Sequence, residues 1–191
     1  MGARLGRGVL LHACCAPCAC AVVECLRRSG VDFTVFFSNS NIYPEEEYLK
    51  RRDELRRFLR GEGVPLVEDV YDHADWRRAV KGLEREPERG GRCSVCFGYR
   101  LGRAVRYAER EGFGLVATTL ASSRWKTQAQ VDNAGLRATK GVANVTYWAR
   151  NWRRAGLQLR RGELIRFLGL YNQNYCGCEF APGKGKDAGS A

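Results

Sequence analysis

The sequence predicts an α/β fold built on a mostly parallel sheet with helices on both faces. Short apolar or β-branched runs, typical of buried strands, alternate along the chain with segments that repeat apolar residues at helical spacing. Of the 191 residues, 45% are hydrophobic, and a chain of this size can bury a core without disulfide bonds. No internal repeat or clear linker divides the chain. We therefore expect one domain over residues 1–180 and a disordered tail over residues 181–191.

The first half of the chain alternates three strand signals with three helix signals. The clearest helix places three glutamates, Glu45–Glu47, in its first turn and Arg60 in its last turn, which complements the helix dipole. We expect strands over Val9–His12, Phe33–Phe37 and Leu66–Tyr71, and helices over Pro17–Arg28, from Pro44 to a stop at Gly61, and over Ala74–Leu83.

The second half continues this alternation after a loop rich in glycine, proline and charge, Glu84–Arg92. In a parallel sheet with helices on both faces, ligands bind outside the carboxyl ends of the strands. The first cysteines of the chain follow the first expected strand directly, so we expect them at this edge. We expect helices over Ser94–Arg110, Trp125–Thr139 and Glu163–Tyr171, a strand over Leu115–Leu120 and an extended segment over Ala143–Trp148.

The charge of the chain favours a partner that is rich in phosphate. There are 32 Lys and Arg against 21 Asp and Glu, which gives a formal net charge of +11. Basic side chains neutralise phosphates and release their counterions, although an Arg-biased composition would give the same excess. No run reaches the roughly 18 apolar residues of a membrane helix, and the start lacks the apolar stretch of a signal peptide. We expect a cytoplasmic protein without a membrane partner, whose nine cysteines stay reduced.

Seven of the nine cysteines fall into three groups, each at an expected loop or helix edge. Four thiolates suffice for a tetrahedral zinc or for a [4Fe–4S] cluster, so seven are more than one structural zinc can use. The surplus favours an iron–sulfur cluster together with a second metal or a redox-active thiol pair. The candidate cluster and metal ligands are Cys14, Cys15, Cys18, Cys93, Cys96, Cys176 and Cys178.

The vicinal pair Cys14 and Cys15 favours two adjacent centres over one. Neighbouring side chains on an extended backbone point to opposite faces, so these thiols would not easily hold one metal ion. A bent turn between strand and helix would weaken that inference. Cys25, on the apolar face of the first helix, is expected to be a small buried hydrophobe, and Cys20 also favours a structural role. His12 is either a ligand or proton donor, or a hydrogen-bonded structural histidine.

Six motifs follow one another along the chain. They are His12-Ala-Cys-Cys-Ala-Pro-Cys18, Asn41-Ile-Tyr-Pro-Glu-Glu-Glu-Tyr48, Val80-Lys-Gly-Leu-Glu84, Arg92-Cys-Ser-Val-Cys-Phe97, Thr118-Thr-Leu120 and Tyr171-x-Gln173-x-Tyr-Cys-Gly-Cys178. In this order, over about residues 9–180, they resemble the QueH-type epoxyqueuosine reductases. Each motif is weak alone, and their combination is specific.

The resemblance implies an enzyme that reduces epoxyqueuosine to queuosine at the wobble position of tRNA anticodons. Two electrons convert an epoxide on the cyclopentane ring to an alkene, with loss of water. Members of the family do not use cobalamin and carry a [4Fe–4S] cluster beside a separately bound iron, on a Rossmann-like sheet related to that of the pyrophosphate-loop enzymes. The iron could act on the epoxide oxygen as a Lewis acid while the cluster delivers electrons from a donor that the sequence does not identify.

The resemblance makes the seven grouped cysteines metal-site candidates without dividing them between cluster and iron. Asp72, in a family-like Tyr-Asp pair, and His12 are the catalytic candidates, with a helix N-cap as the alternative for Asp72. Two segments depart from the family pattern: Ser122–Lys126, where the family commonly has a histidine, and Trp148–Gly156. Both keep basic and aromatic residues, which suit phosphate contact and stacking on an unpaired base.

Two other functions stay open on the sequence. One is a zinc-stabilised RNA-binding module without catalysis, and the other is a thiol–disulfide oxidoreductase. An oxidoreductase of that kind needs only one Cys-x-x-Cys, which leaves most of the thiols without a role. Nucleotide hydrolysis is disfavoured, because the segment Ala13–Cys18 has no glycine where the pyrophosphate-loop enzymes carry a glycine-bearing loop.

Overall fold

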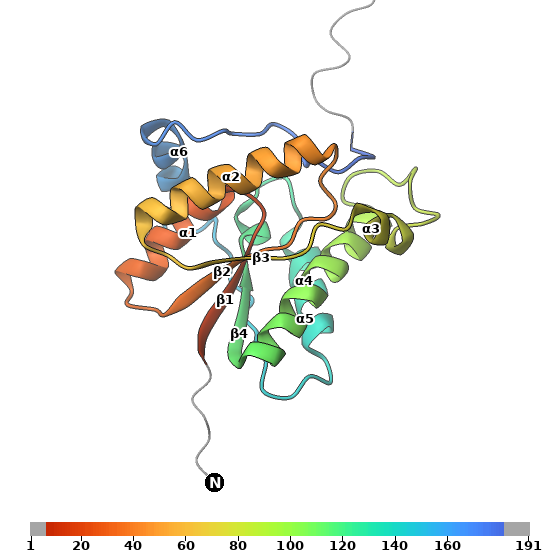
Figure 1. Ribbon diagram of the computed structural model, residues 1–191, viewed down its shortest axis with the longest axis horizontal. Coiled ribbons are helices and arrows are strands. Elements are labelled where there is room, and N and C mark those ends of the chain that lie inside the picture. The colour runs from red at the N-terminus through yellow and green to blue at the C-terminus, as the bar shows by residue number, and fades with distance from the viewer. Residues whose placement is uncertain (1–6, 182–191) are drawn as a thin grey trace, which may run out of the picture.

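A single five-stranded sheet forms the centre of the molecule in the computed structural model, which describes residues 7–181 (Figure 1). The strand order is β3-β2-β1-β4-β5, and every pairing is parallel. This architecture confirms the predicted Rossmann-like α/β class. The strands are β1 (Arg7–Ala13), β2 (Phe33–Phe37), β3 (Leu66–Glu68), β4 (Phe113–Thr118) and β5 (Thr146–Tyr147).

Helices cover both faces of the sheet, as Figure 1 shows, with α1, α2 and α6 on one side and α3, α4 and α5 on the other. A short 3-10 helix, η1 (Thr119–Ser122), follows β4 directly. The α-helices are α1 (Ala16–Arg28), α2 (Glu45–Glu62), α3 (His73–Ala79), α4 (Gly91–Glu111), α5 (Gln128–Thr139) and α6 (Leu157–Phe167).

The two faces of β1 supply two separate parts of the core, because side chains alternate along a strand. Val9 and Leu11 pack in the larger cluster, with residues of α1 and α2. Leu10 packs on the opposite face, in a cluster that contains Phe36 of β2 and Val105 of α4. Burial on both faces explains why β1 reads as a continuous apolar run in the sequence.

Several element boundaries differ from the sequence prediction. Helix α2 continues past Gly61 to Glu62, and its C-cap is Gly63, whose backbone has a left-handed φ of 65° that favours glycine. The third strand stops at Glu68, and α6 begins at Leu157, six residues earlier than expected. The predicted tail over residues 181–191 lies outside the described residues except for Ala181, which is buried and donates its backbone N–H to the carbonyl of Cys178.

The strand order places a topological switch beside β1. From β1 the sheet grows toward β2 and β3 on one side and toward β4 and β5 on the other. The last paired residues of β1 and β4 are His12 and Thr118, so the chain leaves both strands at the same edge. A crevice at this edge is the usual ligand site of such sheets. Within residues 7–181, no helix combines the length and apolar character that a membrane crossing requires.

Candidate metal centre

Three thiols converge in the turn between β1 and α1. The backbone of Cys15 is extended at the N-cap of α1, and Cys18 follows in the first turn of the helix. The sulfur atoms of Cys14, Cys15 and Cys18 all lie within 4.8 Å of one another, with 3.8 Å between those of Cys14 and Cys15. The three thiols could therefore hold one metal ion. The expectation that vicinal thiols point apart is wrong here, because the chain bends from strand to helix at this pair.

Four more thiols form a second group, from the start of α4 and from the C-terminal segment. Cys96 of α4 is buried against Trp76, and Cys178 packs on the same cluster. Burial raises the pKa of Cys96, with further contributions from Cys176 and Cys93. Burial also raises the pKa of Cys178 to about 12, with contributions from Cys176 and Cys96. The charge of Cys176 thus contributes to the pKa of each of the other three thiols in this group.

A cavity of about 1180 Å³ lies between the two groups. Five of the seven candidate thiols contribute to its lining, and Cys96 and Cys178 do not. Cys93 and Cys176 of the second group thus face the same cavity as the three thiols of the first group. The thiols that line the cavity are Cys14, Cys15, Cys18, Cys93 and Cys176.

Arg51 of α2 holds the C-terminal segment in place. Its Nη1 donates to the backbone oxygen of Cys176 at 2.9 Å, and its Nε donates to Glu47 at 2.6 Å. Gly177 lies against the guanidinium with a φ of +87°, and a side chain there would collide with Arg51. The backbone N–H of Tyr43 donates to the oxygen of Gly177 at 2.9 Å. The loop that carries Cys176 is therefore fixed from two sides.

Cations lower the pKa of one thiol in the second group. Burial acts to raise the pKa of Cys176, but Lys126 and Arg100 outweigh it, so this pKa lies below its usual range. The Nζ of Lys126 is 3.7 Å from the sulfur of Cys176. In the first group, hydrogen bonds from Cys15 and Cys18 hold the pKa of Cys14 well below its usual range. Each group thus contains one thiol that is poised to ionise, which is the form that binds metals.

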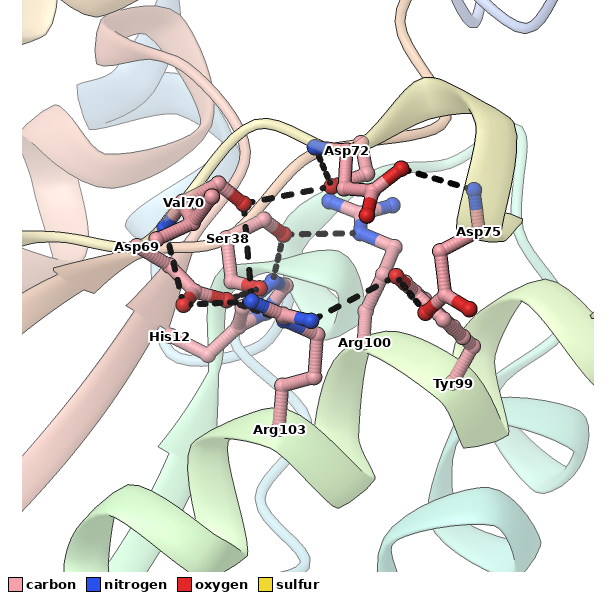
Figure 2. A network of polar contacts seen from close by, with 10 residues as sticks. His12, Ser38, Asp69, Val70, Asp72, Asp75, Tyr99, Arg100 and Arg103 are labelled. Carbon is pink, nitrogen blue, oxygen red and sulfur yellow. Dashed lines mark hydrogen bonds and ion pairs between the residues drawn. The ribbon is translucent and has the colours of Figure 1, made fainter. Parts of the chain in front are cut away.

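His12 belongs to a buried polar network (Figure 2), and it is not among the described residues that line the cavity. Its Nε2 is 3.1 Å from the carbonyl of Ser38, to which it donates, and its Nδ1 is 2.8 Å from the hydroxyl of Thr118. Burial, and then the charge of Arg100, lower the pKa of His12 to about 3, so the ring is neutral. These contacts confirm that His12 is a hydrogen-bonded histidine, which is one of the two alternatives from the sequence. A part for His12 in proton transfer stays a prediction.

The network extends from the sheet to two arginines of α4. Arg100 donates to the carbonyl of Ser38 at 3.3 Å and also to the side chain of Asn39. The hydroxyl of Ser38 donates to Asp69 at 2.6 Å, and Arg103 forms an ion pair with Asp69 (Figure 2). Because Arg100 also lines the cavity, the network connects the sheet to the cysteine cavity.

Asp72 caps α3. Its side chain accepts a hydrogen bond of 2.8 Å from the backbone N–H of Asp75, which confirms the N-cap alternative. Among the described residues that line the cavity, Asp72 does not appear. A role of its carboxylate in proton transfer stays a prediction.

Arg51 and Lys126 were missed as site residues by the sequence analysis. Arg51 carries a detectable signal, because Tyr48, Arg51, Leu55 and Phe58 recur at helical spacing and place an arginine on the apolar face of α2. An arginine on such a face has a buried partner in most cases. Lys126 gives no comparable signal, since only the fold brings it to Cys176.

Comparisons with known proteins show the family to which this chain belongs. The family model for epoxyqueuosine reductase QueH matches residues 9–184. The chain is 43% identical to the epoxyqueuosine reductase QueH of Histophilus somni, over 91% of this chain and 71% of that protein. It is 42% identical to the relative of that name from Acinetobacter baylyi, over 91% and 79%, and 31% identical to the one from Thermotoga maritima, over 91% and 89%. The chain therefore belongs to the epoxyqueuosine reductase QueH family.

Proposed function

We propose that this protein reduces epoxyqueuosine in tRNA to queuosine, at an iron–sulfur site made by the cysteines around the cavity. One observation carries the proposal: thiols from three distant stretches of sequence converge at the carboxyl edge of the sheet. Membership of the family supplies the substrate, because the relatives are named epoxyqueuosine reductase. An oxidoreductase that uses tRNA would work in the cytoplasm and would need an electron donor of its own.

The donor set fits iron–sulfur chemistry. Thiolates are soft ligands that suit iron–sulfur clusters, and a [4Fe–4S] cluster takes four of them. The second group, Cys93, Cys96, Cys176 and Cys178, offers that number. The first group offers three sulfur atoms within 4.8 Å, which suits a single iron with a position left for substrate. When bound, such a cluster supplies electrons and such an iron polarises the epoxide oxygen.

The reaction requires two electrons and two protons for each epoxide. Both carbon–oxygen bonds break, an alkene forms between the two carbons, and the oxygen leaves as water. The chain's own residues bind and shield the reacting ring in the cavity. Lys126 brings a half-buried positive charge to the sulfur of Cys176, and Arg161 is a further cation in the lining. A cavity of about 1180 Å³ is ample for a modified nucleoside.

The test is expression in a bacterial strain that accumulates epoxyqueuosine, followed by mass spectrometry of the nucleosides from digested tRNA. We expect queuosine to replace the epoxide. The Cys93→Ala variant is the matched control, and we expect it to leave the epoxide unchanged. Persistent epoxide with the unaltered protein, despite soluble and iron-loaded material, would defeat the proposal. Colourless protein with stoichiometric zinc would instead favour the RNA-binding module.

A further inference from the structure

An exposed tryptophan stands at the mouth of the cysteine cavity. Trp125 contributes to the cavity lining, yet its side chain keeps 49% of its surface exposed. The guanidinium of Arg124 lies over the indole ring, 4.9 Å from its centre. Other large exposed apolar residues, such as Phe167, do not line this cavity. A large exposed aromatic side chain at the entrance of a basic site is typical of a surface that contacts a ligand, because an aromatic side chain that stabilises the fold is usually buried.

This part of the mouth is held firmly to the metal site. Arg89 donates from Nε to the backbone oxygen of Trp125 at 3.0 Å, and its backbone N–H donates to the sulfur of Cys93 at 3.3 Å. The amide of Gln130 on α5 donates to the backbone oxygens of Arg89 and Gly90, at 3.0 and 3.1 Å. The position of Trp125 is therefore set by residues that also position a candidate ligand. Such support is what a preorganised binding surface needs.

A second hollow, of about 630 Å³, continues from the same place. It lies between α4 and α5, and it shares Arg89 and Gln130 with the cysteine cavity. Arg137 and Asn133 lie further along it, and none of the described residues in its lining is acidic. A chain with a phosphate backbone could thus leave the cavity mouth along a surface that offers cations and amide donors.

The mouth also carries acidic residues on the loop between α3 and α4. Glu84 and Glu86 line the cavity, but each accepts a hydrogen bond from a backbone N–H, of Gly82 and of Gly91. Their charge is therefore partly satisfied within the protein. Glu88 lines the cavity as well, so the approach of phosphate is favoured on the side of Arg89, Arg124 and the second hollow.

We infer that Arg89, Arg124 and Trp125 form a docking rim for single-stranded RNA. Trp125 stacks on the unpaired base next to the modified nucleotide, and the two arginines contact the flanking phosphates. The inference rests on the proposed function, because a base that enters the cavity must leave its stack. An aromatic side chain at the entrance then replaces the stacking that the neighbouring base has lost. Trp125 lies within the segment Ser122–Lys126, where the sequence departs from the family pattern.

The test measures binding of a fluorescently labelled RNA hairpin, with an anticodon loop that carries guanosine at the wobble position, to the iron-loaded protein. We expect Trp125→Ala to weaken the affinity about tenfold or more, and Trp125→Phe to restore most of it, because phenylalanine keeps an aromatic face. We expect Arg89→Gln and Arg124→Gln each to reduce the dependence of log affinity on log salt by about one phosphate contact. Phe167→Ala, an exposed aromatic on α6, is the matched control and should bind as the unaltered protein does.

Iron content and circular dichroism are measured for each variant, so that a folding defect is not counted as a binding defect. Equal affinity of Trp125→Ala and the unaltered protein would overturn the docking rim, and so would the absence of hairpin binding. Conversion of epoxyqueuosine is assayed separately. If the Trp125→Ala protein converts epoxyqueuosine as well as the unaltered protein does, the docking rim is contradicted and the proposed function stands. If hairpin binding depends on Trp125 but the unaltered protein does not convert epoxyqueuosine, the proposed function is contradicted and the docking rim stands.

Discussion

Arg51 brings a positive charge into the apolar face of α2, where only 4% of its side chain is exposed. Its partner Glu47 is 10% exposed, so each member of the pair depends on the other for solvation. The same guanidinium binds the carbonyl of Cys176 and lies against Gly177. A single residue thus connects the stability of α2 to the placement of a candidate metal ligand.

We predict that Arg51→Gln lowers the free energy of unfolding by about 3–5 kcal/mol, because the largely buried Glu47 loses its cationic partner. The same variant should lose iron, since the Cys176 loop loses its fixed position. Urea denaturation and iron analysis measure the two effects. Arg57→Gln, on the exposed side of the same helix, is the control. An Arg51→Gln protein as stable and as iron-rich as the Arg57→Gln protein would contradict this account of the clamp.

The sorting of the cysteines gives a second prediction at this scale. Cys93→Ala and Cys176→Ala should each abolish queuosine formation and reduce bound iron and acid-labile sulfide, because each removes a thiol from the cavity lining. Cys25→Ala should keep iron, sulfide and activity, and should cost only stability, because Cys25 lies half-buried on α1 and does not line the cavity. Iron and sulfide analysis of the three proteins decides the matter. Loss of metal from the Cys25 variant alone would show that the sorting is wrong.

At the scale of single elements, α3 tests whether Asp72 has a role beyond its cap. Replacing an N-cap carboxylate by alanine costs about 1 kcal/mol, whereas asparagine caps a helix about as well as aspartate. We predict that Asp72→Ala loses about that much stability and that Asp72→Asn keeps both stability and activity. Denaturation and a tRNA conversion assay measure this. Lost activity in a fully stable Asp72→Asn protein would instead establish a role for the carboxylate in proton transfer.

The elements also show where sequence patterns succeed and where they fail. Strand β2 was predicted with its observed bounds, because its β-branched and aromatic run is buried and short. Helix α6 was placed too late, because Leu164 is its only buried residue and its apolar residues follow no clear helical period. Its start depends on Gly156, which has a left-handed φ of 78°, and the sequence gives little warning of that turn.

At the scale of the whole molecule, the ion pair of Asp69 and Arg103 fastens α4 to the sheet beside β3. Burial acts to raise the pKa of Asp69, but hydrogen bonds from Arg103 and Ser38 outweigh it, so this pKa lies below its usual value. The carboxylate therefore contributes stability above its unfolded pKa of about 3.9, and this contribution is lost as the pH falls through the lower folded value.

We predict that Asp69→Asn is less stable than the unaltered protein at pH 7, and that the difference shrinks as the pH falls below about 4. Asparagine keeps the shape of the side chain and removes the titration. Urea denaturation across this pH range measures the difference. A constant difference at every pH would show that the ionisation of Asp69 makes no contribution to stability.

The order of strands and helices could be predicted from the sequence, because the spacing of apolar residues within each segment distinguishes a helix from a buried strand. The pairing of β1 with β4 could not, since residues that are about 100 positions apart meet only in the fold. The same limit applies to the site. Clustering and spacing identified seven thiols, but the turn that brings Cys14 and Cys15 together depends on local backbone angles, and Lys126 reaches Cys176 only through tertiary structure.

The central claim is that thiols gathered at the carboxyl edge of the sheet form an iron–sulfur site that reduces epoxyqueuosine in tRNA. The most direct measurement is a single-turnover reaction under anaerobic conditions, with chemically reduced protein as the only electron source and tRNA that contains epoxyqueuosine. Iron and acid-labile sulfide are determined on the same sample. The account predicts queuosine in proportion to the reduced, iron-loaded protein. Unchanged epoxyqueuosine from protein that contains its iron and sulfide and binds the tRNA would contradict it.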